Sequence, residues 1–215
     1  MVAGMWLAAG FLPPPLPSAS AGEIAAIYQN NMNGIRMGSV MVMLTGAFYL
    51  PFSVLIFVYM RRMEPRQAPV LSYTQLVGGV AGMMLFVVAA VLWTLAAFRP
   101  DRSPEITQAL NDFGWLFFLM PSALPFLQNA ALGLAIIGDK NSPPIMPRWV
   151  GFYSLWSGLI FLPGALSTFF KTGPFAWNGL LALWIPATVF GIWIVVTMVY
   201  LIEAINSADN YPRTE

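Results

Sequence analysis

The residues best suited to hold a ligand are three polar side chains in one otherwise apolar stretch. Ser122, Gln128 and Asn129 lie there together with Pro121 and Pro125. Each proline removes a backbone donor and leaves a carbonyl one turn earlier without its helical partner. Amide side chains in mid-membrane are costly against lipid, so we expect them to face the interior of a helix bundle. Two interpretations remain open: a polar binding site at the prolines, or hydrogen bonds that hold helices together.

Three aromatic residues are predicted to wall such a pocket. Tyr49, Trp156 and Trp184 lie in apolar segments that also carry a proline, and interrupted helices at similar depth would open a central space. Apolar walls would give affinity and the amides would fix orientation, as in most small-molecule pockets. The alternative is that aromatic residues and prolines are simply frequent in membrane helices.

A second polar group precedes this stretch. Asn111 and Asp112, with the nearby Trp115, are predicted to line the outer mouth of the pocket. The alternative for Asp112 is a solvated acid near a helix N-terminus, where the helix dipole favours negative charge.

Much other chemistry is excluded by composition. The 215 residues include no cysteine and no histidine, which removes thiol nucleophiles, iron–sulfur clusters and histidine-based metal sites. We therefore expect no metal, no cofactor and no catalytic residue. The formal net charge is +1, which argues against a nucleic-acid partner, since such a partner needs a clustered basic surface.

The elements that must position these residues are long apolar segments. Hydrophobic residues make up 58% of the chain and charged residues 9%, far below the roughly 25% charged residues of soluble domains. Five segments have the roughly 20 residues that a membrane-spanning helix needs. The sequence therefore predicts an all-α, polytopic transmembrane helix bundle of five full spans and a short N-terminal apolar segment. The spans are expected at Met37–Met60, Val70–Phe98, Phe113–Ile137, Trp149–Phe170 and Gly179–Ile202.

We expect one integral membrane domain over residues 1–215. Residues 1–36 form an apolar stub, a proline-rich turn and a short amphipathic helix, residues 37–205 the five-span bundle, and residues 206–215 a polar tail. The apolar stub is too short to span. It is interpreted as a truncated sixth span, with a cleaved signal sequence and an interfacial segment as alternatives.

The amphipathic helix has a recognisable start. Ser20 followed three residues later by Glu23 forms a capping box, and the helix should run to Asn30. Its apolar face would rest either on the membrane surface or on the bundle.

Loop charges predict the orientation. One side of the membrane would hold six lysines and arginines, including Arg61, Arg62 and Arg66, and the other side four. Because basic residues favour the cytoplasm, we expect a multi-pass protein of a bacterial inner membrane with a cytoplasmic C-terminus.

Small residues at Gly78 and Gly82 form a GxxxG pattern in the one span without proline. Such a pattern lets helix backbones approach closely. It predicts a packing seam inside the bundle, with a dimer face as the alternative.

Several phrases of the chain carry a resemblance. They are residues 11–18, 23–28, 34–36, 111–115, 147–151 and 170–179. Through these phrases the chain resembles a group of small bacterial multi-span membrane proteins without an assigned activity. The resemblance implies architecture only, and because members of that group begin with a complete first helix, it favours the truncated span.

Three classes of function follow. The first is a non-enzymatic membrane module whose partners are the lipid bilayer and either a hydrophobic small molecule or a partner membrane subunit. The second is a transporter or permease for a small neutral or hydrophobic solute, weakened by the lack of charge within the spans. The third is a membrane enzyme acting on a lipid-soluble substrate, which the missing histidine and cysteine disfavour.

Overall fold

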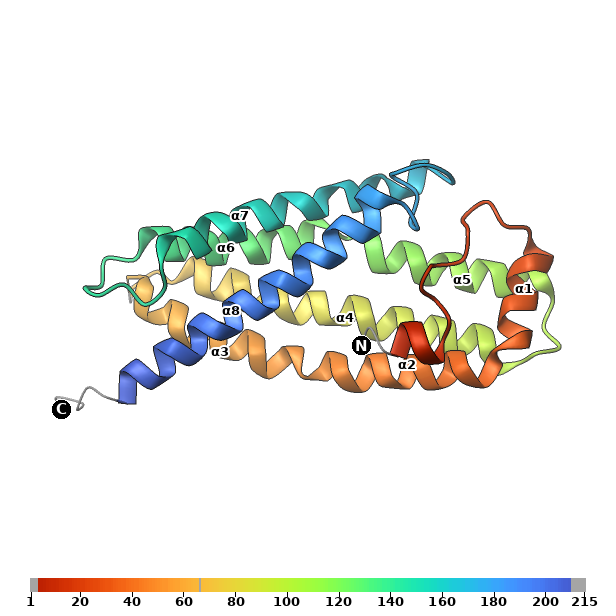
Figure 1. Cartoon of the computed structure of the whole chain (residues 1–215), viewed down its shortest axis with the longest axis horizontal. Helices are drawn as coiled ribbons and strands as arrows, with labels where there is room; N and C mark the ends of the chain where they lie inside the picture. Colours follow the sequence, from red (N-terminus) through yellow and green to blue (C-terminus); the bar gives the residue numbers. More distant parts are fainter. Residues whose placement is uncertain (1–3, 66, 210–215) are drawn as a thin grey trace.

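The computed structural model of the chain describes residues 4–65 and 67–209, and these residues form helices and loops without a strand. Arg66, Arg213 and residues 210–215 of the predicted tail lie outside the described residues. Figure 1 shows long helices running side by side along the longest axis, with shorter segments at the ends.

Five helical stretches are long and apolar enough to cross a membrane, which confirms the predicted fold class. Three of them start earlier than hydropathy alone suggested, and the third stretch shows the largest difference. Pro104 begins the third stretch, nine residues before the predicted start, because proline suits the first turn of a helix and that turn is polar. The stretches are Met32–Met63, Val70–Phe98, Pro104–Gly138, Arg148–Phe169 and Leu180–Ser207.

Four of these stretches are interrupted, or change from one helix type to another, close to a proline. Proline has no N–H and clashes with the carbonyl four residues earlier. Accordingly the first stretch breaks at Phe48, just after the residue four positions before Pro51. Only the second stretch, which contains no proline, is one continuous helix. The segments are α2 (Met32–Ala47), α3 (Tyr49–Met63), α4 (Val70–Phe98), α5 (Pro104–Leu119), α6 (Ala123–Gly138), α7 (Arg148–Phe161), the 3-10 helix η2 (Leu162–Phe169), the π-helix η3 (Leu180–Trp184) and α8 (Ile185–Asp209).

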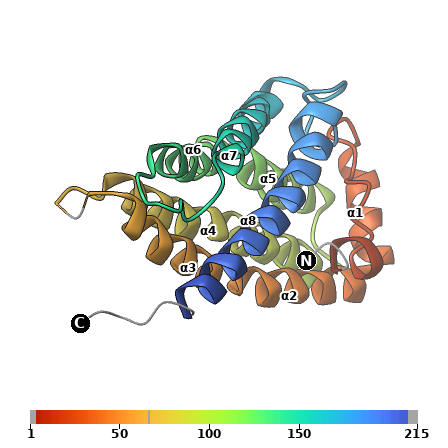
Figure 2. The ribbon, with the colours of Figure 1, turned by 60° about the vertical axis from the view of Figure 1, so that its left-hand side comes forward.

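The uninterrupted helix α4 is the centre of the bundle. It packs against α2, α3, α5 and α6, while α6 packs against α7. Gly78 and Gly79 of α4 face Gln128 and Ser53 on its neighbours, so the small residues form a seam inside the bundle. Helix α8 crosses the other helices obliquely and packs mainly on α7 (Figures 1 and 2).

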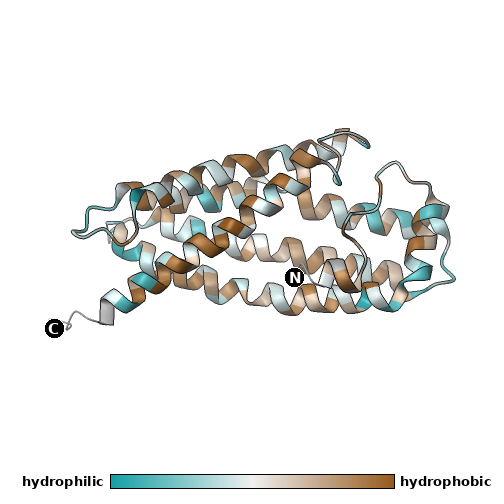
Figure 3. Cartoon of the chain, viewed as in Figure 1, coloured by the Kyte–Doolittle hydropathy of each residue, from teal (hydrophilic) through white to brown (hydrophobic). Residues whose placement is uncertain are grey.

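Apolar side chains also cover much of the outside of the bundle. Leu44, Val77 and Val195 are examples of large side chains that remain more than half exposed along the spans. In Figure 3 hydrophobic colours dominate the long helices, while the hydrophilic colours concentrate in the loops and at the ends. This distribution is expected of a protein whose outer surface meets lipid.

The N-terminal segment packs onto the bundle. It consists of the π-helix η1 (Gly4–Ala8), a proline-rich turn and α1 (Ala21–Asn30). The predicted capping box is present, since Ser20 Oγ accepts from the Glu23 N–H and the Glu23 carboxylate accepts from the Ser20 N–H. The apolar face of α1 is buried against the bundle, chiefly α5, and does not rest free on the membrane surface.

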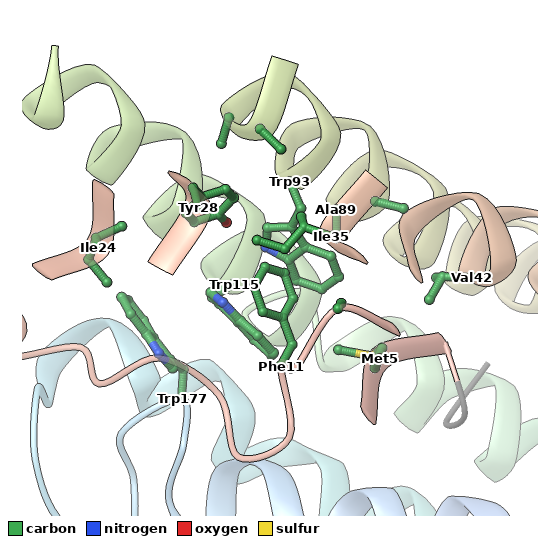
Figure 4. Close-up of a cluster of buried hydrophobic side chains, with 14 residues drawn as sticks. Met5, Phe11, Ile24, Tyr28, Ile35, Val42, Ala89, Trp93, Trp115 and Trp177 are labelled. Atoms are coloured by element: carbon green, nitrogen blue, oxygen red, sulfur yellow. The ribbon is translucent and has the colours of Figure 1, made fainter. Parts of the chain in front are cut away.

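Two hydrophobic clusters fill the ends of the bundle. The aromatic cluster is built around Phe11, Tyr28, Trp93, Trp115 and Trp177, with smaller apolar side chains between them (Figure 4). The aliphatic cluster at the other end is built around Ile56, Met60, Leu132, Ile136, Met146, Trp193 and Leu201. The space between the two clusters holds the candidate site.

Candidate ligand-binding site

A cavity of about 270 Å³ lies between the aromatic and the aliphatic cluster. Phe86 and Phe118 line it and also pack on the aromatic cluster, whereas Tyr49 and Phe190 line it and pack on the aliphatic cluster. All five spans contribute to its wall. The remaining lining residues are Gly82, Leu85, Leu119, Ser122, Pro125, Gln128, Phe161, Gly164, Ala182, Leu183, Pro186, Ala187, Gly191 and Ile194.

The cavity lies where the helices are interrupted. Ser122 and Pro125 belong to the α5–α6 break, Gly164 to the 3-10 segment, and Pro186 to the change from η3 to α8. Tyr49 follows the α2–α3 break directly. Regular helices fill the space between them by interlocking rows of side chains, and those rows are disrupted where the helix type changes. The cavity and the helix interruptions thus coincide in the structure.

Three lining residues carry polar side chains, and all three were predicted from the sequence. Tyr49 Oη donates to Gln128 Oε1 at 2.9 Å, and Ser122 Oγ donates to the Leu162 carbonyl at 3.5 Å. Gln128 is only 1% exposed. Tyr49 and Gln128 form the polar corner of the cavity, Ser122 is a separate polar lining residue beside Leu162, and the rest of the wall is apolar.

A second polar layer stands behind the polar corner. Gln75 Nε2 donates to Ser53 Oγ at 3.1 Å, and both side chains are fully buried. Gly79 lies between this pair and Gln128. A Cβ added at Gly79 would be 2.0 Å from Ser53 Oγ and 3.0 Å from Gln128 Nε2, so only glycine leaves room for both side chains. Gln75 Oε1 and Gln128 Nε2 have no hydrogen-bond partner among the described residues. The polar residues of α3, α4 and α6 therefore meet at one depth of the bundle.

Asn129, predicted as a site residue, does not line the cavity. Its Nδ2 donates to the Pro125 carbonyl at 2.8 Å, and its Cβ lies 3.2 Å from the position of a Cβ at Gly158 on α7. Consecutive residues of a helix point about 100° apart, and here that rotation turns Asn129 away from the cavity and toward Gly158 of α7. Asn129 packs at the α6–α7 contact and Gln128 at the cavity.

Two of the three predicted aromatic walls lie elsewhere. Trp156 is 49% exposed, Trp184 is 38% exposed, and neither lines the cavity. The aromatic walls are instead Tyr49, Phe161, Phe190 and the pair Phe86 and Phe118. Phe161 could have been recognised, because it begins an aromatic–aliphatic–proline triplet, Phe161-Leu-Pro163. Phe86 carries no local signal, since α4 has no proline.

The predicted outer mouth is part of the packed core. Asn111 and Trp115 are 0% exposed, and Trp115 belongs to the aromatic cluster. Asn111 Oδ1 accepts from Tyr28 Oη at 3.1 Å, and Asn111 Nδ2 donates to Asp112 Oδ1 at 3.0 Å. The bond from Tyr28 joins α1 to α5, and Asn111, Asp112 and Trp115 do not line the cavity.

The Tyr28 hydroxyl keeps its proton under ordinary conditions. Burial, reinforced by the negative charge of Asp112, raises the pKa of Tyr28 well above its usual value. The hydroxyl therefore remains a hydrogen-bond donor to Asn111 throughout the physiological range.

Residues 4–65 and 67–209 contain no group of three or more acidic, histidine or cysteine side chains that could hold a metal ion. The chemistry that the cavity offers is apolar contact with hydrogen bonding at one corner.

No family model, curated protein or solved structure matches the chain.

Proposed function

We propose that this protein is a non-enzymatic membrane module that binds a small lipid-soluble molecule in the cavity between its two hydrophobic clusters. The observation that carries the proposal is a cavity of about 270 Å³ with apolar walls and one polar corner, enclosed by helices of membrane-spanning length. Small-molecule pockets commonly measure about 300–1,000 Å³ and combine apolar walls with a few polar groups. The volume of this cavity lies just below that range of pocket volumes, so its ligand must be small.

The rim of the cavity supports entry from the bilayer. Ala187 and Gly191 of α8 line the cavity and are exposed at the same time. A Cβ added at Gly191 would meet nothing within 4 Å. The cavity therefore has a side that side chains leave uncovered, and the exposed neighbours Ile192 and Val195 on the same helix are apolar. A lipid-soluble ligand would reach this side without crossing water.

The polar corner suits binding better than catalysis. The polar groups of the whole cavity wall are one phenol, one hydroxyl and one amide, and each already takes part in a hydrogen bond. Proton transfer near neutral pH normally uses a carboxylate, an imidazole or an amine with a shifted pKa. Transport of a small neutral solute is the second candidate, because carriers also bind their solutes where helices are interrupted.

The proposal also includes the membrane in which the protein lies and the side of it on which the C-terminus is found. Arg61 and Arg62 lie in the last turn of α3, Arg66 follows in the sequence before α4, and basic residues at the end of a span favour the cytoplasm. An even number of crossings separates the end of α3 from the end of α8. We therefore place the C-terminus in the cytoplasm of a bacterial cell.

The proposal is tested by blocking the uncovered side. Native mass spectrometry of the protein, extracted with its lipids into nanodiscs, should detect a retained small molecule in the wild type. Gly191→Trp fills the rim and should reduce occupancy at least about tenfold, a change of about 1.4 kcal/mol. Val195→Trp is the matched control, since Val195 lies one turn further along α8, is 61% exposed and does not line the cavity.

Occupancy equal in Gly191→Trp and Val195→Trp would contradict the proposal. A wild type that is empty in every preparation would favour the transport candidate, which flux measurements in vesicles would then address.

A further inference from the structure

We infer that the ligand of the cavity carries a hydroxyl group, which donates a hydrogen bond to Gln128 Oε1. The ligand class is a small apolar alcohol or phenol. This inference rests on the proposed function and assigns the chemistry of the molecule bound there. It follows from the direction in which each polar group of the corner already points.

The polar corner presents acceptors. Tyr49 Oη has given its proton to Gln128 Oε1 at 2.9 Å. Gln128 Oε1 lies 3.9 Å from the position of a Cβ at Gly82, which is itself a lining residue. A carbonyl oxygen has two acceptor sites, so Gln128 Oε1 has one left after the bond from Tyr49. The Tyr49 oxygen, having donated, can also only accept.

The donor side of the Gln128 amide points away from the cavity. Gln128 Nε2 lies 3.0 Å from the position of a Cβ at Gly79, on the side of Ser53. Gly79 is buried inside the bundle and does not line the cavity. The nitrogen is therefore held toward α4 and α3, and the oxygen remains the atom that a ligand meets.

The amide is held in this orientation by close packing. A Cβ at Gly78 would lie 3.0 Å from Gln128 Cβ, so the α4 backbone presses on the base of the side chain. Tyr49 fixes its oxygen from the other side. In this structure the side chain therefore turns its oxygen, and not its buried nitrogen, toward the cavity.

The remaining polar lining group agrees with this assignment. Ser122 Oγ directs its proton toward the Leu162 carbonyl at 3.5 Å, which leaves its lone pairs as acceptors. A ligand ketone or ether would place a further acceptor against these oxygens and gain no hydrogen bond. A ligand hydroxyl would gain one, and an ionised ligand would be buried without a partner of opposite charge.

The test uses three photoreactive probes with one shared apolar skeleton and a diazirine, ending in a hydroxyl, a ketone or a methyl group. Each is added to the protein in phosphatidylcholine nanodiscs, and labelled peptides are identified by mass spectrometry. The alcohol should label the cavity peptides about fivefold more than the other two probes, the effect of one ordinary neutral hydrogen bond. The methyl probe measures apolar binding alone.

Two matched variants separate recognition from stability. Gln128→Leu should remove the alcohol preference and keep labelling by the methyl probe. Asn129→Leu removes the neighbouring buried amide, which does not line the cavity, and should keep the preference.

A third variant, Tyr49→Phe, frees the acceptor site on Gln128 that Tyr49 now occupies. It should raise alcohol labelling about twofold, since two equivalent acceptor sites are then open.

Equal labelling by the three probes, or a preference for the ketone, would overturn the assignment of a hydroxyl. A preference that survives Gln128→Leu, or one that Tyr49→Phe abolishes, would overturn the assignment to Gln128 Oε1. Cavity peptides that no probe labels would overturn the proposed function itself.

Discussion

The aromatic cluster and the cavity adjoin each other, yet one is filled and the other is not. In the aromatic cluster the Trp93 and Trp115 ring centroids lie 4.8 Å apart, and Phe11 meets Trp93 edge-on at 5.4 Å. A Cβ at Gly114 would lie 2.4 Å from Trp93 Nε1, so even a methyl group has no room there. At Gly191, beside the cavity, a Cβ would meet nothing within 4 Å. Side chains therefore pack more tightly in the aromatic cluster than at the rim of the cavity.

The difference follows from the elements around each region. The aromatic cluster lies on the regular helix α4 and the regular part of α5, and the N-terminal segment closes it. Asn31 Nδ2 donates to the Ala8 and Ala9 carbonyls at 3.0 Å, and Trp177 Nε1 donates to the Pro15 carbonyl at 2.8 Å. The cavity is bounded by the helix interruptions instead. Regular helices support dense packing, and interrupted ones leave space.

The largest expected effect is the loss of a ring from the aromatic cluster. Trp93→Ala removes a 2% exposed side chain that contacts Phe11, Trp115 and Phe118. We expect the free energy of unfolding to fall by about 3–5 kcal/mol, the usual cost of such a deletion. Unfolding in mixed micelles measures it.

The control for Trp93→Ala is Trp156→Ala, at a 49% exposed site facing outward. It should change stability by no more than about 0.5 kcal/mol. Equal losses for the two variants would mean that the aromatic cluster is not the more tightly packed region.

A single methyl group sharpens the comparison. Gly114→Ala places a Cβ against Trp93, and overpacking of this kind costs about 1–3 kcal/mol. Gly82→Ala adds the same group at the cavity, where Gln128 Oε1, 3.9 Å away, is the nearest atom outside its own helix turn. This change should be neutral or stabilise by up to about 1 kcal/mol, because alanine favours helix more than glycine does.

Thermal unfolding of the Gly114→Ala and Gly82→Ala variants, measured in parallel, checks the sign of each effect. If Gly82→Ala were the more damaging substitution, the cavity would be the better packed of the two regions.

The smallest expected effect lies at the start of α1, which carries Tyr28 into the aromatic cluster. Hydrogen bonds from the Ser20 backbone and then from its side chain lower the pKa of Glu23 below its ordinary value of 4.5. The capping interaction is therefore complete above pH 4.5 and is lost as the pH falls through the lowered value. Hydrogen exchange of the first α1 amides, corrected for intrinsic rates, should lose protection in that window.

Glu23→Gln is the control for this pH effect, because glutamine also closes a capping box and does not titrate. The variant should show no change in hydrogen-exchange protection of these amides between about pH 6 and about pH 3, two values that lie on either side of the ordinary carboxylate pKa range. A protection loss of the same size in Glu23→Gln would assign the effect to another group.

Sequence patterns predicted the parts of the site that depend on local chemistry. Prolines locate helix interruptions because they remove a donor wherever they occur, and the cavity lies at those interruptions. Tyr49, Ser122 and Gln128 were identified in this way, and all three line the cavity. The same reasoning included Asn129 and Trp184, which do not line it, because nearness to a proline says nothing about the direction of a side chain.

The sequence by itself determined the class of fold and the five stretches that are long and apolar enough to span a membrane. Hydrophobic length and proline are local properties, so no neighbour is needed to interpret them. Only the tertiary structure decided which side of each helix faces the cavity. It turned Phe86 and Phe190 toward the cavity, Trp156 outward, and Trp115 into the aromatic cluster. The rotation of a helix depends on packing against its neighbours, and those neighbours lie far away in the chain.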